Sequence, residues 1–104
     1  MILLHIHANS IEQADKIAHK LIEEKLVYKI YQLENYFEFN SKYVNAEIEK
    51  CVILQAPTKS LLFNEIEKMI EEICGDDVPL FYGVPMTNFC NAHHDKIINA
   101  TEKR

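Results

Sequence analysis

The sequence is poor in several residue types, and each shortage excludes a class of protein. It has only two glycines, Gly75 and Gly83, so neither a G-x-G-x-x-G dinucleotide fingerprint nor a P-loop can be written. Its three cysteines form no C-x-x-C pair, which is typical of reduced thiols. No hydrophobic run approaches the ~18 residues of a membrane span, and no basic segment of a signal peptide opens the chain. We therefore expect a cytoplasmic protein without a membrane partner.

The length and the balance of charge favour an ordinary globular domain. The 104 residues are 48% hydrophobic and 26% charged, and this length predicts a single domain over residues 1–104. The net charge is −5 with neutral histidines, which argues against a nucleic-acid partner. No catalytic set such as G-x-S-x-G is present. We expect a protein that is not an enzyme.

The first part of the chain has the pattern of a strand followed by a helix. The apolar residues Ile2, Leu4, Ile6 and Ala8 alternate with Leu3, His5 and His7, which predicts a strand over Ile2–Ala8. Apolar residues then recur at helical spacing over Ile11–Lys25. Ser10 and Gln13 have the spacing of a capping box at the start of this helix. The same strand–helix order returns over Cys51–Ile73.

A long hairpin joins these two halves. Val27–Phe39 is predicted to form its first strand, and Glu47–Ala56 is predicted to return as the second. Period-2 alternation places four large side chains of the first strand on one face. These are Tyr31, Leu33, Phe37 and Phe39.

Three further elements complete the second half. Thr58 has the side chain of an N-cap and is expected to begin a helix that ends near Gly75. Val78–Val84 is predicted to form a short strand. A last helix is expected from about Asn91, or slightly before it, to Thr101.

This order of elements predicts the fold. Strand–helix–strand, repeated once and followed by a helix, is the α+β, ferredoxin-like βαββαβ arrangement with an antiparallel sheet and a C-terminal helix. Both long helices should lie on one face of the sheet. The other face would present Leu3, His5 and His7 together with part of the aromatic hairpin. An uncovered face with that much apolar surface predicts association with other chains.

Several segments resemble one known family along nearly the whole chain. They are EQADKIAHKLIEEKL at Glu12–Leu26, LF…EIEKMI at Leu62–Ile70, and the pair Val78-Pro79. In these segments the chain resembles the CutA family of divalent-ion tolerance proteins. The resemblance implies a PII-like homotrimer that acts as a binding or regulatory protein in divalent metal (copper) tolerance or homeostasis. Three positions of the last helix also match: Ala92, Asp95 and Ile97.

The chain departs from this family where the family contacts its ligands. The family's cysteine after the first helix falls on Lys29, and its histidine before the last strand falls on Cys74. The neighbouring Pro and Tyr become Gly75 and Asp76, and the acidic residue after Val-Pro becomes Leu80. Two alternatives therefore stay open. One is a PII-like sensor of a small anionic metabolite at the inter-subunit cleft, and the other is a structural trimer whose site has decayed.

Two groups of residues are candidates for a divalent metal, with copper or zinc as the expected ion. Cys90, His93 and His94 are spaced by three and four residues, which places them near one helix face. His5 and His7 are two apart on a strand and so share a face. Thiolate and imidazole ligands suit zinc and copper. No other cofactor is expected.

Overall fold

The described chain alternates strands and helices in the order that the sequence predicts. The computed structural model describes the backbone of residues 1–38 and 49–101. The predicted turn of the hairpin, with Phe39 and Tyr43, lies outside the described residues. The elements are β1 (Ile2–Ala8), α1 (Ile11–Glu23), β2 (Tyr31–Glu38), β3 (Glu49–Thr58), the short 3-10 helix η1 (Ser60–Leu62), α2 (Phe63–Cys74), β4 (Leu80–Pro85) and α3 (Asn91–Ala100).

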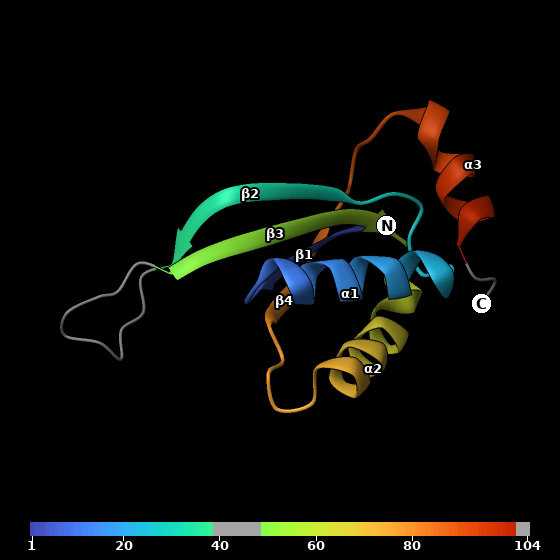
Figure 1. Cartoon of the computed structure of the whole chain (residues 1–104). Coiled ribbons are helices and arrows are strands. Elements are labelled where there is room, and N and C mark those ends of the chain that lie inside the picture. Colours follow the sequence, from blue (N-terminus) through green and yellow to red (C-terminus); the bar gives the residue numbers. More distant parts are fainter. Residues whose placement is uncertain (39–48, 102–104) are drawn as a thin grey trace.

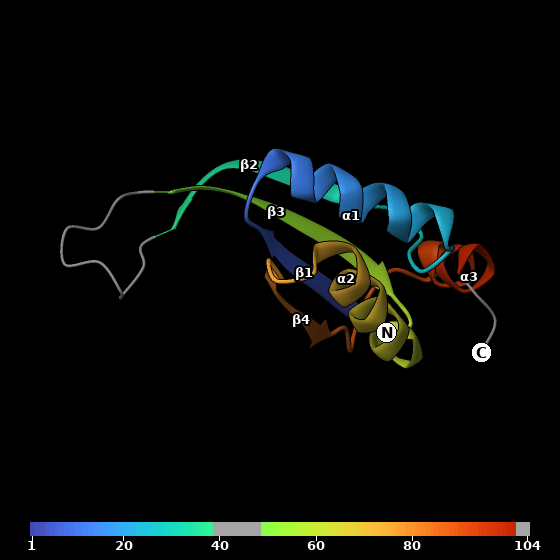
Figure 2. The same ribbon diagram turned by 60° about the horizontal axis from the view of Figure 1, so that its bottom comes forward.

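The four strands form one antiparallel sheet in the order β2-β3-β1-β4. Helices α1 and α2 lie side by side along one face of this sheet (Figures 1 and 2). Helix α3 lies apart from them, beyond one end of the sheet (Figure 1). This arrangement confirms the predicted ferredoxin-like fold, because each βαβ half places its helix on the same face of the sheet.

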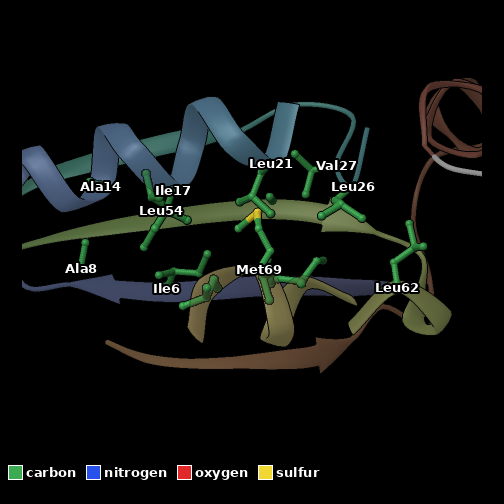
Figure 3. Close-up of a cluster of buried hydrophobic side chains, with 14 of the residues drawn as sticks. Ile6, Ala8, Ala14, Ile17, Leu21, Leu26, Val27, Leu54, Leu62 and Met69 are labelled. Atoms are coloured by element: carbon green, nitrogen blue, oxygen red, sulfur yellow. The ribbon is translucent and has the colours of Figure 1, made fainter. Parts of the chain in front are cut away.

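The core lies between the sheet and the two long helices. Leu4, Ile6 and Ala8 of β1 have no exposed surface, and alternate residues of β3 lie beside them. Side chains of both helices point onto these strands (Figure 3). The helical contribution comes from Ala14, Ile17 and Leu21 of α1 and from Ile66, Met69 and Ile70 of α2.

The start of α1 confirms the predicted cap by Ser10, whereas the Gln13 side chain bonds to Asn9 instead of to the N-cap residue. Ser10 Oγ accepts a hydrogen bond from the Gln13 N–H at 3.1 Å. The Gln13 carbonyl oxygen Oε1 in turn accepts from the Asn9 N–H at 2.8 Å. Two backbone donors at the helix start are therefore satisfied by side chains.

The end of α1 differs from the prediction by two residues. Lys25 adopts a φ of 56°, in the left-handed region, so the helix cannot continue through it. The N–H groups of Lys25 and Leu26 return to the carbonyls of Ile22 and Leu21, at 3.1 and 2.9 Å. This turn sends Leu26 and Val27 into the core, and β2 therefore begins at Tyr31 instead of Val27.

The predicted role of Thr58 is wrong. Thr58 is the last residue of β3, it has no exposed surface, and its hydroxyl donates to the Leu26 carbonyl at 2.5 Å. The first paired residue of β2, Tyr31, lies opposite Gln55, so β2 does not extend as far as Pro57. Strand β3 can therefore continue through Pro57. Pro57 therefore leaves no strand bond unmade on that side. Helix α2 follows η1 without a side-chain cap.

The hairpin and the later elements also differ in detail. The pairing of β2 with β3 shifts between Leu33 and Tyr36, so the regular alternation predicted for β2 is wrong. Strand β3 ends two residues later than predicted, and its predicted start at Glu47 lies outside the described residues. Strand β4 starts two residues later and includes Pro85. Helix α3 begins at Asn91, and of its apolar residues only Ile97 is buried.

We predict that Thr58→Val destabilises the protein by about 1–3 kcal/mol, because it leaves the buried Leu26 carbonyl without its donor. Urea unfolding at fixed protein concentration measures this change. The matched control is Thr87→Val, at an exposed position. Equal unfolding free energies for the two variants would contradict the structural role of this bond.

Candidate functional site

The face of the sheet turned away from α1 and α2 carries side chains in rows across the strands. Strand pairing places His5 opposite Tyr82 of β4, and His7 opposite Leu80. On the other side His5 lies opposite Gln55 of β3. We call this surface the open face. Its described members are Leu3, His5, His7, Tyr31, Leu33, Ile53, Gln55, Leu80, Tyr82 and Val84.

Large apolar side chains on the open face are exposed. The exposed fraction is 67% for Leu80, 54% for Tyr31, 42% for Val84 and 40% for Tyr82. Three of these four side chains come from the edge strand β4, at alternate positions. Contiguous exposed apolar surface of this kind marks interaction sites on soluble proteins.

An aromatic and imidazole cluster lies at the centre of the open face. The Tyr82 ring stacks on His5 with centroids 5.2 Å apart, and on His7 at 5.6 Å. The Tyr82 hydroxyl lies 3.3 Å from His7 Nε2, within hydrogen-bond reach. The two histidines predicted to share a face do so, and Tyr82 joins them. Period-2 alternation along β4 was the signal in the sequence that could have placed Tyr82 there.

The environment of His5 disfavours its protonated form. Partial burial lowers the pKa of His5, and the nearby charge of His7 lowers the pKa further. Both effects oppose a positive charge on this ring. His5 is therefore held neutral to a lower pH than a free histidine.

The second predicted group of ligands is only partly assembled. Cys90 is the N-cap residue of α3, and its Sγ lies 3.1 Å from His93 Nδ1. His94 instead stacks on Phe89, with centroids 5.8 Å apart, and its Nδ1 lies 3.4 Å from an Asp95 carboxylate oxygen. The structure thus brings Cys90 and His93 together and gives His94 other neighbours.

Neither group provides a complete metal site within one chain. Among residues 1–34 and 51–101, whose side chains the structure describes, no cluster of three or more His, Cys, Asp or Glu side chains is placed to hold a metal ion. Zinc takes four ligands in structural sites and three protein ligands in catalytic ones. Cys90 with His93, or His5 with His7, would each provide two. Metal binding by these residues stays a prediction.

One of the positions that depart from the family's ligand pattern, Cys74, lies in a structural network with Gln13 and Asp77. The Gln13 amide Nε2 donates to the Asp77 carbonyl at 2.6 Å and lies 3.7 Å from Cys74 Sγ. Asn9 Nδ2 donates to an Asp77 carboxylate oxygen at 2.9 Å. Burial, followed by the charge of Asp77, raises the pKa of the Cys74 thiol. The network ties the loop after α2 to the start of α1.

Lys29 lies beside aromatic rings near the end of the sheet. Its Nζ lies 5.0 Å from the centroid of Tyr28 and 5.9 Å from that of Tyr31. These residues line a cavity of about 240 Å³ together with Cys90 and His93. The cavity therefore combines apolar walls, one cation and a thiol–imidazole pair.

The sheet order and the placement of the helices define an α+β protein of the ferredoxin-like class. The sequence model of the CutA1 divalent ion tolerance protein matches residues 2–99. The chain therefore belongs to the CutA1 family, as the resemblance implied. No curated protein sequence matches it significantly.

Solved structures of this family share the fold at low sequence identity. CutA1 from Pyrococcus horikoshii is 22% identical, with a TM-score of 0.88, over 99% of this chain and 100% of that chain. CutA1 from Oryza sativa is 16% identical, with a TM-score of 0.89, over 99% and 94%. An Archaeoglobus fulgidus protein described as a periplasmic divalent cation tolerance protein is 22% identical, with a TM-score of 0.82, over 97% and 98%.

We predict that His5 titrates below about 6.5, the ordinary histidine value. His7→Asn should raise the pKa of His5 only in part, because burial is the larger cause. NMR titration of the imidazole protons measures both values. A His5 pKa at or above the ordinary value would contradict the geometry of the cluster.

The same shift makes folding depend on pH. Below about pH 6.5, His5 becomes protonated in the unfolded chain, whereas in the folded chain its lowered pKa keeps it neutral to a lower pH. The free energy of unfolding should therefore fall as the pH falls. Urea unfolding from pH 7.5 to pH 5 measures this slope. His5→Asn should flatten this slope, and an unchanged slope in His5→Asn would contradict the assignment.

Proposed function

We propose that this CutA1-family chain is a non-enzymatic, cytoplasmic homotrimer that acts as a binding or regulatory protein in divalent metal tolerance. The observation that carries the proposal is the open face, where Leu80, Tyr82 and Val84 of one edge strand are exposed beside a histidine pair. The family supplies the link to divalent ions. The number three comes from the resemblance, whereas the exposed surface argues only for association.

Burial of the open face would provide the free energy for association. Fully burying one large apolar side chain contributes on the order of 1.5–3 kcal/mol. Four such side chains are exposed on this face in each chain: Tyr31, Leu80, Tyr82 and Val84. Because these side chains are 40–67% exposed in the single chain, each would contribute part of that value, and a closed ring would repeat the contribution at every interface against the cost of association.

Association would also change the metal chemistry of the histidine pair. His5 and His7 lie on the face that we expect to be buried between copies. A single chain offers two imidazoles there, and a ring of copies would bring further imidazoles toward the same axis. This supports shared sites for copper or zinc, with the Cys90–His93 pair as the second candidate.

One observation favours the alternative of a sensor for a small anionic metabolite. Lys29 lines the cavity of about 240 Å³, and its ammonium lies near the Tyr28 ring. A thermal-shift panel of Cu²⁺, Zn²⁺, Mg²⁺ and ATP separates the functions. Stabilisation by a metal supports metal tolerance, stabilisation by ATP supports the sensor, and no response supports a structural trimer.

Multi-angle light scattering at low micromolar concentration should give a mass of about 37 kDa, three times 12.2 kDa. The double variant Leu80→Asp/Tyr82→Asp should reduce the mass toward 12.2 kDa, because it places two charges in the buried face. The matched control is Leu61→Asp/Ile22→Asp, at positions that are 73% and 49% exposed on the helical side. A monomeric wild-type protein, or an equal effect of the control, would overturn the proposed interface.

Metal binding should depend on one of the two pairs. We expect copper or zinc affinity to fall at least about tenfold in either Cys90→Ser/His93→Ala or His5→Ala/His7→Ala. Affinity should also weaken below about pH 6, where free imidazoles protonate. Isothermal titration of both double variants decides this assignment. If both bind as tightly as the wild-type protein, neither pair holds the metal.

A further inference from the structure

The cavity where α3 meets the end of the sheet combines apolar walls with one lysine. It has a volume of about 240 Å³, and its walls come from three separate segments of the chain. These segments are the start of β2 with the residues before it, the end of β3, and the chain from Met86 into α3 (Figure 1). Because all of its walls belong to one chain, the cavity is formed without a second copy.

The ammonium of Lys29 lies among aromatic rings in this cavity. The residue is partly buried, and its Nζ lies 5.0 Å from the centroid of Tyr28 and 5.9 Å from that of Tyr31. Within residues 1–34 and 51–101, Lys29 forms no ion pair with a carboxylate. Withdrawing a cation from water without an opposite charge costs free energy. A bound carboxylate would offset that cost.

The walls of the cavity favour a planar, apolar molecule. Tyr28 and Phe89 provide aromatic rings, Met86 and Ile97 provide aliphatic side chains, and the described lining contains no acidic residue. Aromatic rings prefer stacked or edge-to-face contacts with other rings. Ligand sites are mostly apolar, with a few polar groups that fix the orientation of the ligand. A small aromatic molecule with one carboxylate matches this combination.

Two larger cavities of the same chain carry the opposite charge. A cavity of about 530 Å³ beside α1 and β2 includes Glu23, and a cavity of about 290 Å³ at the start of α1 includes Glu12 and Glu34. The described linings of both contain no lysine or arginine. An anion is therefore expected to select the smaller cavity at Lys29.

We propose that this cavity binds small aromatic carboxylates. The carboxylate pairs with the Lys29 ammonium, and the ring of the ligand contacts Tyr28 and Phe89. The proposal rests on the alternative function of an anion sensor, and it names the chemical class of the anion. It requires neither the histidine pair of the open face nor a metal ion.

The first test uses indole-3-acetate as the probe. The chain contains no tryptophan, so indole fluorescence reports the probe alone. Indole-3-acetamide is the neutral counterpart of this probe, and tryptamine is the cationic one. We expect the acetate to bind at least about tenfold more tightly than the amide, and tryptamine to bind most weakly. Equal affinity for the three probes, or no saturable binding of the acetate, would overturn the proposal.

Variants of the lysine separate the effect of charge from that of shape. Lys29→Met keeps most of the side-chain stem and removes the charge, so it should weaken indole-3-acetate at least about tenfold. It should leave the affinity for indole-3-acetamide nearly unchanged, which also shows that the cavity is intact. The matched control is Lys68→Met, at an exposed position of α2, which should bind both probes like the wild-type protein. An equal loss of both probes in Lys29→Met, or no loss of either, would contradict the role of Lys29.

Amide NMR spectra with indole-3-acetate locate the site. The largest shifts should centre on Tyr28, Lys29 and Ile97. Shifts centred on Ala18 and Ile22 would place the probe in the larger cavity beside α1 and contradict the proposal. If ATP stabilises the protein while indole-3-acetate does not bind, the anion sensor stands and the inference of an aromatic carboxylate alone is wrong.

Discussion

A four-stranded sheet has two faces, and both long helices of this protein lie on the same one. The two βαβ halves impose this constraint, because each crossover places its helix on that face. The core between the sheet and the helices is closed by Leu4, Ile6 and Ala8, which have no exposed surface. The open face carries the side chains that alternate with these core residues, which are Leu3, His5 and His7. Its chemistry therefore follows directly from the period-2 geometry of the strands.

The connections around the core determine where each functional residue lies. The left-handed turn at Lys25 directs Leu26 into the core, where its carbonyl accepts the hydroxyl of Thr58. This bond fixes the end of β3 beside the start of the hairpin. Tyr28 and Lys29 follow immediately and line the same cavity as Cys90. The thiol–imidazole pair of α3 thus lies against a segment that the core itself positions.

Sequence patterns predicted the elements that depend on local rules. The alternation of β1 and the cap by Ser10 were sufficient for the first strand and helix. Thr58 was misassigned because its environment depends on Leu26, which is distant in the sequence. Spacing alone also grouped His94 with Cys90, because the sequence did not show that Cys90 precedes the helix. The metal sites themselves stay predictions.

The central claim is that a second copy of the chain covers the open face. Hydroxyl-radical footprinting at micromolar concentration tests it within one molecule, because Leu80 on the open face and Leu61 on the helical side are similarly exposed in the single chain, at 67% and 73%. We predict that Leu80 is protected while Leu61 is oxidised, and that dilution to nanomolar concentration removes the difference. Equal oxidation of Leu80 and Leu61 at micromolar concentration would contradict the account.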